Sequence, residues 1–393
     1  MLTAREVKPG IWWVGGIDWN ERMFHGYTTE MGITYNAYLI MDEKVTLIDT
    51  VKAKFADELL QRISQIVDPS KIDVVITNHV EMDHSGSLPR IHEVAPNAEI
   101  YASAPAGVKE VAAHFGIDVK GVKTGDSISI GKRTLTFVQT PMVHWPDNMV
   151  TYCLEDKVLF SNDAFGQHYA TSKHLDVEND LCETMLQARK YYANIVQPYQ
   201  TQARKALEAV KTLDLEMIAP SHGIIWTKHI PDILEAYTQF TSGEVKEKAL
   251  VVYDSMWQST AKMAKAICEA FVEEDVPARY IDLKEMHQSD IMTDFLDTKY
   301  VCVGSPTLNS QMLPTVASFL CYMRGLSPKN KQRVGLAFGS YGWAPIGPKN
   351  VGKELEAAGF QLPVDTVACN WIPSQEYLDN LQATVRAMIE KAE

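Results

Sequence analysis

The sequence predicts an α/β protein made of two domains that differ in architecture. Three observations support this fold class. The chain has 393 residues, which exceeds the size that one hydrophobic core normally supports. Its first part places short apolar strands next to polar loops, whereas its last part alternates apolar strands with helical stretches in a regular order. We therefore expect a first domain over residues 1–245 and a second domain over residues 246–393.

The first domain is expected to stack its strands in two sheets with helices outside. Residues 34–50 read as two strands around the turn DEK, and IDVVITN (72–78) reads as a continuous apolar strand. Helical spacing of apolar residues occurs at 55–67 and 105–116. Further strands are predicted at 98–103, 133–140, 149–163 and 216–223, and several of these strands end near a histidine or an aspartate.

The second domain is expected to be a doubly wound parallel sheet of five strands. The predicted strands are KALVVYD (248–254), ARYIDL (278–283), KYVCVGSP (299–306), RVGLAFGS (333–340) and LPVDTVACN (362–370). Helical stretches begin near Thr260, Glu285, Pro314, Gly347 and Ser374. Strands that alternate with helices form parallel sheets, and such sheets bind ligands in the loops at the carboxyl ends of their strands.

Composition excludes several classes of protein. The formal net charge of −13 argues against nucleic-acid binding, which needs a basic face. No apolar run reaches the roughly 18 residues of a membrane span, and the N-terminus lacks a signal sequence, so a cytoplasmic location is expected. No Cys-x-x-Cys occurs, which argues against a rubredoxin or zinc-ribbon site. We expect reduced, mostly buried cysteines at Cys153, Cys182, Cys268, Cys302, Cys321 and Cys369.

The stretch TNHVEMDHSG (77–86) carries the strongest chemical signal. It places His79, Glu81, Asp83 and His84, four potential metal ligands, within six residues directly after a predicted strand. Alternate side chains of an extended segment share a face, so one loop can offer ligands to two neighbouring metals. Chance is a poor explanation for such crowding in a chain with 11 histidines.

Three later strand ends supply matching donors. They are His144 in TPMVHWPDN, Asp163 in FSNDAFG and His222 in APSHGIIW. We expect one metal on His79, Glu81 and His144, a second on Asp83, His84 and His222, and Asp163 between them. Nitrogen and oxygen donors without thiolate suit iron, manganese or zinc. We interpret the remaining histidines as ordinary surface or hydrogen-bonded core residues: His92, His114, His168, His174, His229 and His287.

The second domain carries three loops suited to a flavin. YDSMWQSTAKMA follows its first strand and resembles the flavodoxin phosphate loop, with Gln258 where glycine is common. GSPTLNSQMLP and GSYGWAPIG follow its third and fourth strands, where the ring system of a flavin mononucleotide (FMN) would lie. The predicted contact residues are Ser255, Met256, Trp257, Gln258, Ser259, Thr260, Pro306, Thr307, Leu308, Asn309, Ser340, Tyr341, Gly342, Trp343 and Ala344.

The ligand loop resembles the His-x-His-x-Asp-His signature of the metallo-β-lactamase fold, with Glu81 in place of the second histidine. Together with the flavodoxin-like half, essentially the whole chain resembles the flavodiiron proteins. This resemblance implies a metallo-β-lactamase-like αββα sandwich followed by a flavodoxin-like domain, with two irons and FMN as cofactors. It implies reduction of dioxygen to water, of nitric oxide to nitrous oxide, or of both. His25 and Tyr191 match positions that line the substrate pocket of the family.

The resemblance also implies a head-to-tail homodimer, or a dimer of dimers, and an external electron donor. A rubredoxin-like protein or a reduced deazaflavin coenzyme could fill that role, and no motif chooses between them. No motif separates dioxygen from nitric oxide, or shows whether His84 ligates iron in every state. Two rival functions are a zinc-dependent hydrolase with an accessory flavodoxin domain and a non-catalytic flavin electron carrier. Glu81 and the complete set of seven donors count against the hydrolase.

Overall fold

The computed structural model of the protein describes residues 3–328 and 332–392, which form two compact units. One unit contains the chain up to Tyr192 together with Tyr199–Thr241, and the other contains Ala193–Pro198 and the chain from Ser242 onward. Within the second unit, the Asn194 side chain donates to Ser289 O at 3.0 Å and accepts from the Tyr322 hydroxyl at 2.8 Å. In the two described ranges, no helix is long and apolar enough to cross a bilayer.

Within its described residues, the first unit contains a seven-stranded sheet in the order β1-β2-β7-β8-β9-β10-β11 and a five-stranded sheet in the order β12-β13-β14-β15-β16. Two small sheets, β3-β6 and β4-β5, accompany them. The strands are β1 (Arg5–Lys8), β2 (Ile11–Trp13), β3 (Gly16–Asp18), β4 (Met23–Phe24), β5 (Tyr27–Thr28), β6 (Ile33–Tyr35), β7 (Tyr38–Ile40), β8 (Val45–Ile48), β9 (Ile72–Thr77), β10 (Glu99–Ser103), β11 (Lys120–Val122), β12 (Ser127–Ser129), β13 (Thr134–Gln139), β14 (Met149–Cys153), β15 (Val158–Asn162) and β16 (Met217–Pro220).

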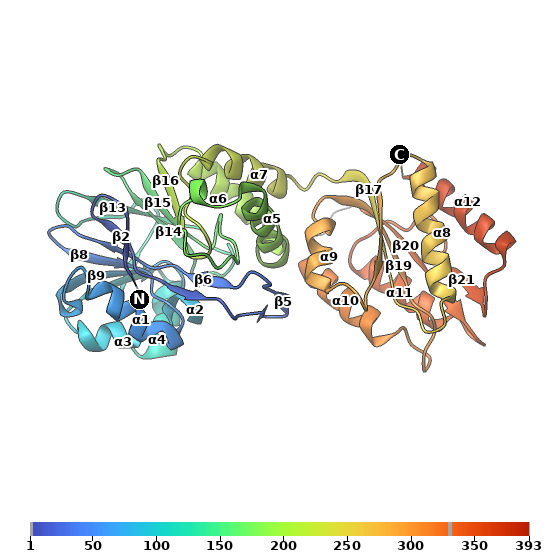
Figure 1. The fold of residues 1–393 in the computed structure, drawn as a ribbon, viewed down its shortest axis with the longest axis horizontal. Helices are drawn as coiled ribbons and strands as arrows, with labels where there is room; N and C mark the ends of the chain where they lie inside the picture. Colours follow the sequence, from blue (N-terminus) through green and yellow to red (C-terminus); the bar gives the residue numbers. More distant parts are fainter. Residues whose placement is uncertain (1–2, 329–331, 393) are drawn as a thin grey trace. The chain divides into compact units, whose positions relative to one another are not determined.

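The helices of the first unit are α1 (Ala56–Ile63), α2 (Met82–Ser85), α3 (Leu88–Val94), α4 (Ala106–Phe115), α5 (Leu181–Tyr191), α6 (Gln200–Val210) and α7 (Ile230–Ser242). Short 3-10 turns lie at Ala53–Phe55, Pro69–Lys71 and Asp176–Glu178. A π turn at Tyr192–Val196 and a 3-10 turn at Gln197–Tyr199 cover the segment Ala193–Pro198, which belongs to the second unit. Figure 1 shows α1, α3 and α4 next to the β8–β9 side of the unit and α5, α6 and α7 next to the β14–β16 side.

Alternating side chains build the sandwich. Ile48 and Val74 point into a buried cluster that also contains Phe137 and Phe160 of the other sheet, so this cluster lies between the two sheets. Their neighbours in sequence, Leu47 and Val75, belong to a second cluster with residues of α1, α3 and α4. Both faces of the seven-stranded sheet are therefore covered, which is the αββα arrangement that the resemblance implies.

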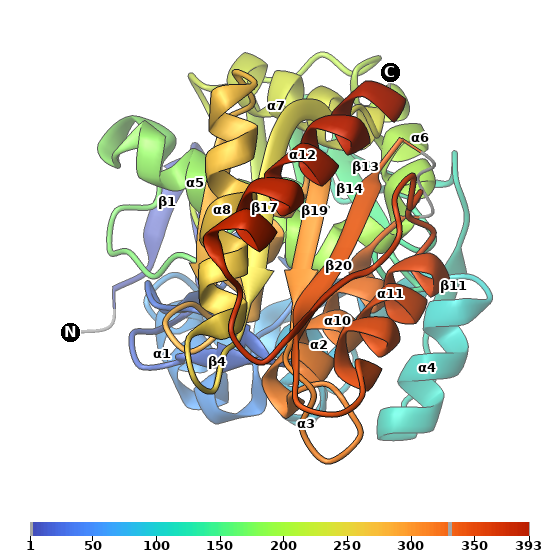
Figure 2. The same cartoon turned by 90° about the vertical axis from the view of Figure 1, so that its right-hand side faces the viewer.

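The second unit is a doubly wound parallel sheet in the order β18-β17-β19-β20-β21, which is the strand order of flavodoxin-like folds. Figures 1 and 2 show α8 and α12 on one face of this sheet, and Figure 1 shows α9, α10 and α11 on the other. The elements are β17 (Lys246–Tyr253), α8 (Ser259–Glu273), β18 (Ala278–Asp282), α9 (Gln288–Phe295), β19 (Thr298–Gly304), α10 (Pro314–Leu326), β20 (Val334–Tyr341), α11 (Ile346–Ala357), β21 (Val367–Asn370) and α12 (Gln375–Lys391).

The predicted fold class is confirmed, and the differences are local. α9 begins at Gln288 instead of near Glu285, because His287 caps it: its ring nitrogen accepts from Ser289 N–H. β21 begins only at Val367, although the apolar pattern starts at Leu362. All six cysteines are free, but Cys182 and Cys321 are exposed, so the expectation of burial holds for only part of the set.

Candidate functional site

The ligand loop begins where β9 ends and is anchored by a buried aspartate. Asp49 accepts from Asn78 N–H at 2.7 Å and from the Asn78 side-chain amide at 3.0 Å. The loop then turns into the short helix α2, which carries Asp83 and His84, while His79 and Glu81 precede it. Both hydrogen bonds hold the chain at the strand end, so the loop leaves the sheet in a defined direction.

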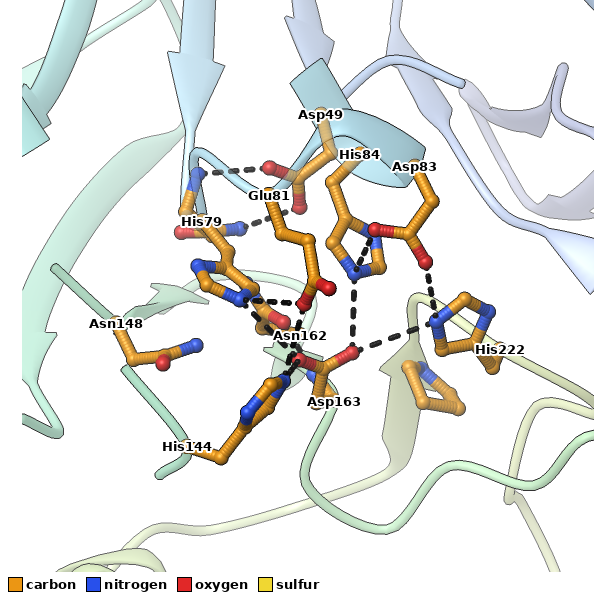
Figure 3. A network of polar contacts seen from close by, with 12 residues as sticks. Asp49, His79, Glu81, Asp83, His84, His144, Asn148, Asn162, Asp163 and His222 are labelled. Atoms are coloured by element: carbon orange, nitrogen blue, oxygen red, sulfur yellow. Dashed lines mark hydrogen bonds and ion pairs between the residues drawn. The ribbon is translucent and has the colours of Figure 1, made fainter. Parts of the chain in front are cut away.

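The remaining donors come from the ends of three other strands. His144 follows β13, Asp163 follows β15 and His222 follows β16. β15 and β16 are parallel neighbours, so their carboxyl ends lie at the same edge of the sheet. The structure brings all seven predicted donors together at this edge (Figure 3).

The donors form two groups. His79, Glu81, His144 and Asp163 make the first group, and Asp83, His84 and His222 make the second. In the first group, Glu81 Oε2 lies 3.4 Å from His79 Nε2 and 3.1 Å from His144 Nε2. In the second group, His222 Nε2 lies 3.3 Å from Asp83 Oδ2, and His84 Nε2 lies 3.4 Å from Asp83 Oδ1.

Asp163 faces both groups with different oxygens. Its Oδ2 lies 3.7 Å from His79 Nε2 and 3.5 Å from His144 Nε2. Its Oδ1 lies 3.1 Å from His84 Nε2 and 3.5 Å from His222 Nε2. A carboxylate in this position can bind one cation through each oxygen, and this geometry lets Asp163 bridge two metals.

The donor set fits metal ions because its polar atoms point at one another without forming proper hydrogen bonds. Within the described residues, His79 Nε2, His84 Nε2, Asp83 Oδ1 and both oxygens of Asp163 are buried and lack a hydrogen-bond partner. Buried polar atoms without partners are unfavourable, and one cation in each donor group would satisfy them.

Hydrogen bonds from outside the groups orient the imidazoles. Asp147 accepts from His79 Nδ1, with its oxygens 3.1 and 2.9 Å away, and the backbone carbonyl of Thr34 accepts from His222 Nδ1 at 2.7 Å. In both histidines the outer nitrogen is engaged, so Nε2 is the nitrogen that faces the site. Such partners fix the tautomer and raise the basicity of a metal-binding imidazole. Asp147 was not among the predicted site residues.

The charges of the site attract cations. Burial raises the pKa of Asp163, but the positive charges of His84, His79 and His144 outweigh it and hold this pKa well below its usual range. Burial lowers the pKa of His84, yet the Asp83 and Asp163 carboxylates raise it to about 9. The carboxylates therefore stabilise positive charge at this place, whether it is carried by imidazolium protons or by metal ions.

His25 and Tyr191 lie next to the groups in different surroundings. His25 Nε2 lies 3.1 Å from Glu81 Oε1, and its side chain is 67% exposed. Tyr191 is buried with its ring 5.9 Å from that of His222, and burial raises the pKa of its hydroxyl well above the usual value. Tyr191 thus keeps its hydroxyl protonated, and its ring lies near that of the predicted metal ligand His222.

The interpretation of His168 as a surface or hydrogen-bonded core residue is wrong. This histidine is buried against His222, with ring centroids 5.0 Å apart, and neither ring nitrogen has a hydrogen-bond partner among the described residues. Burial, followed by the charge of His222, holds its pKa well below the usual value. Its position five residues after Asp163, on the same loop, was the available signal in the sequence.

A cavity of about 460 Å³ lies at the carboxyl ends of the second unit's strands. Its lining includes eight of the predicted flavin contacts and two residues of the loop after β21 that were not predicted, Trp371 and Ile372. The eight are Met256, Trp257, Ser259, Pro306, Thr307, Ser340, Tyr341 and Gly342. The other predicted contacts lie outside this lining: Ser255, Gln258, Thr260, Leu308, Asn309, Trp343 and Ala344.

The local geometry of the cavity fits a flavin nucleotide. Gln258 has φ +67° at the start of α8, which explains why glycine is common at this place in phosphate loops. The buried Thr260 hydroxyl pairs with Ser340 Oγ at 3.1 Å and links the phosphate loop to β20. Trp371 packs so closely over Gly342 that a Cβ there would come within 2.9 Å of its ring. The cavity thus combines a helix N-terminus, hydroxyl groups and aromatic walls.

Fold and site together define a two-domain metalloprotein with a flavodoxin-like half. The model of the ODP family beta lactamase matches residues 33–223, and the flavodoxin model matches residues 251–382. The chain belongs to the flavodiiron protein family.

Three relatives illustrate the family. The nitric oxide reductase of Moorella thermoacetica is 44% identical over 381 residues, which cover 95% of this chain and 94% of that protein. The coenzyme F420H2 oxidase of Methanothermobacter marburgensis is 42% identical, and the match covers 96% of each chain. The structure of the rubredoxin oxygen:oxidoreductase from Desulfovibrio gigas superimposes with a TM-score of 0.94 at 40% identity, covering 99% of each chain.

Proposed function

We propose that this protein is a flavodiiron oxidoreductase that reduces dioxygen to water, nitric oxide to nitrous oxide, or both. The observation that carries the proposal is the pair of donor groups joined by Asp163, in the same chain as a flavodoxin-like cavity. Relatives named as reductases and oxidases of these kinds support it over 95% or more of the chain.

The proposed ligands are His79, Glu81 and His144 for one iron, and Asp83, His84 and His222 for the other, with Asp163 bridging. Three carboxylates place three negative charges on the metals, which favours iron that cycles through its ferric state. A histidine at position 81 would suit a zinc hydrolase better than Glu81 does, and no feature of the site favours that rival function.

When bound, the two irons supply electrons and binding positions for the gas, and FMN supplies electrons to the irons. The chain holds the rest of the chemistry in place. Asp163 keeps the two positions adjacent, and His25 positions Glu81 through the contact between its Nε2 and Glu81 Oε1. Tyr191, whose ring lies 5.9 Å from that of His222, keeps the proton on its hydroxyl. We propose Tyr191 as a hydrogen-bond donor toward the reacting molecule.

The cavity of the second unit is the proposed FMN site. Ser255, Ser259 and Thr260, with the N-terminus of α8, would hold the phosphate. Backbone atoms around Thr307, Leu308, Asn309, Gly342 and Ala344 would approach the polar edge of the ring, and Met256, Gln258, Pro306 and Ser340 would complete the loops. Trp257, Tyr341 and Trp343 would shield the ring, and Trp371 adds a further wall that lines the cavity.

We further propose a head-to-tail homodimer, or a dimer of dimers, in the cytoplasm. Each unit exposes large apolar side chains near its site. Trp257 and Trp343 are 87% and 86% exposed by the flavin cavity, and Met82 is 50% exposed beside the metal ligands. A partner subunit would cover such surfaces. The proposed electron donor is a rubredoxin-like protein or a reduced deazaflavin coenzyme, in line with the names of two relatives.

The test uses purified protein with confirmed iron and FMN content, reduced in the absence of air. Mixing with dioxygen or with nitric oxide and following repeated turnover should show consumption of at least one gas, with water or nitrous oxide as product. Zinc without iron, together with hydrolysis of a thioester or lactam, would instead support the hydrolase. Reversible flavin reduction without consumption of either gas would support an electron carrier.

A further inference from the structure

His168 is a buried histidine that the proposed mechanism does not yet use. It lies on the loop that follows β15, five residues after Asp163, and it is 1% exposed. Within residues 3–328 and 332–392, neither Nδ1 nor Nε2 of this ring has a hydrogen-bond partner. Burial of an imidazole without hydrogen-bond partners lowers the stability of the protein. The two nitrogens are therefore available to bind a ligand.

The surroundings of His168 are aromatic on several sides. Its ring stacks on Tyr27 at 5.0 Å, meets Phe24 edge-on at 5.1 Å and lies perpendicular to Tyr191 at 4.9 Å. Such walls keep water away and hold the ring in one orientation. A further neighbour is the metal ligand His222, whose ring lies perpendicular to it at 5.0 Å.

His222 and Tyr191 connect this ring to the second metal position. The rings of Tyr191 and His222 lie 5.9 Å apart, so the three side chains form one contacting group. His222 Nε2 faces Asp83 and Asp163, and its Nδ1 is engaged by Thr34 O. His168 therefore contacts a ligand of the second position through its ring, and both of its nitrogens lack a partner among the described residues.

We propose that His168 forms a hydrogen bond to the molecule held at the position formed by Asp83, His84 and His222. This inference rests on the proposed function, because the bound molecule would be a diatomic gas or a small anion in its place. A neutral imidazole offers one donor and one acceptor, so it can bind the distal atom of such a ligand. His168 would then be a catalytic residue, not a packing residue.

Azide and nitric oxide are suitable probes of this hydrogen bond in the iron-loaded holoenzyme. His168→Phe keeps a flat ring and removes both nitrogens, and His168→Gln keeps an N–H donor. We expect His168→Phe to bind azide about tenfold more weakly in the oxidised protein, the size expected for one hydrogen bond to a charged group. The N–O stretching frequency of the nitric oxide adduct of the reduced protein should shift, and His168→Gln should restore part of both signals.

A matched control is available in the same unit. His174 is also a buried histidine, stacked on Trp13 at 4.1 Å, and it lies outside both donor groups. His174→Phe should leave the azide affinity and the N–O frequency unchanged. If His168→Phe fails to fold, His168→Leu provides the same comparison.

Two results would overturn the inference. If His168→Phe and His168→Leu bind azide as tightly as the natural protein and leave the N–O frequency unchanged, the histidine serves packing only. If the two variants lose iron from the second position, His168 supports the ligand His222 and does not bind the substrate molecule. If the natural protein consumes neither gas but the azide effect is present, the proposed reductase function fails while the hydrogen bond stands.

Discussion

Asp147 orients the ligand His79, and its removal should weaken one metal position more than the other. The side chains of Asp147 and His79 are fully buried. Both carboxylate oxygens lie within 3.1 Å of His79 Nδ1, and Oδ2 also accepts from Val80 N–H at 2.6 Å. Asp147→Asn keeps the size of the side chain but replaces one oxygen by an NH2 group. Whichever way the amide turns, one N–H donor then faces another donor.

The magnitude follows from the lost interaction. A hydrogen bond to a charged group contributes about 1.5–3 kcal/mol. Loss of such a partner behind a metal-binding histidine typically lowers metal affinity by about 10–100-fold. At about 1.4 kcal/mol per tenfold change, the two estimates agree. We expect the affinity for the metal on His79, Glu81 and His144 to fall by this factor, and the position formed by Asp83, His84 and His222 to change little.

The assay is a competition of iron-loaded protein with a chelator, with iron content followed against chelator concentration. Asp176→Asn is a suitable control, because Asp176 is a buried carboxylate of the same unit that accepts from Thr227 N–H at 2.9 Å and His229 N–H at 2.7 Å. This control should lower the free energy of unfolding without changing iron release. Unchanged iron retention in Asp147→Asn, or equal iron loss from both variants, would refute the reasoning.

Three further predictions concern the ligand Glu81, the flavin cavity and the carboxyl group of Glu110. Glu81→His should raise the ratio of zinc to iron in protein loaded from a mixture of both, because an anionic oxygen donor is lost; an unchanged ratio would contradict the argument. Trp371→Ala should weaken FMN binding about tenfold, because an aromatic wall of the cavity is lost. Flavin fluorescence measures this affinity. The control is Trp19→Ala at an exposed position of the first unit, which should leave FMN binding unchanged. Burial, followed by the Asp147 charge, raises the pKa of Glu110 to about 7 from 4.5. The folded chain then binds more protons, so the free energy of unfolding of the metal-free protein should fall as pH rises from about 4.5 to about 7. In urea unfolding, Glu110→Gln should show a smaller decrease of the free energy of unfolding over this pH range. Parallel pH profiles of the variant and the natural protein would contradict this prediction.

Of the residues that the sequence analysis missed, some could have been predicted and others could not. The rule that ligands bind at the carboxyl ends of parallel strands was applied to three loops of the second domain. Applied to the loop after the last strand, it would have included Trp371. Asp147 lies three residues after His144 and Glu110 lies on a separate helix, and their roles depend on which side chain they meet. Neither the spacing nor the type of these residues indicates which side chains they contact in the fold.

The amino-acid pattern alone was sufficient to predict the fold class and the ligand loop. Strand and helix periods are local properties, and alternation of strands with helices leaves few ways to build a parallel sheet. The four donors His79, Glu81, Asp83 and His84 lie within six residues of the chain, so their proximity follows from covalent geometry.

The way in which the other donors come together depends on the three-dimensional fold. His144, Asp163 and His222 come from separate strand ends, and nothing local specifies that Asp163 turns one oxygen toward each group. The same holds for His168, whose unpartnered nitrogens depend on the aromatic side chains that surround it. Burial and orientation arise from packing between segments that are distant in sequence, and a linear pattern carries no information on those distances.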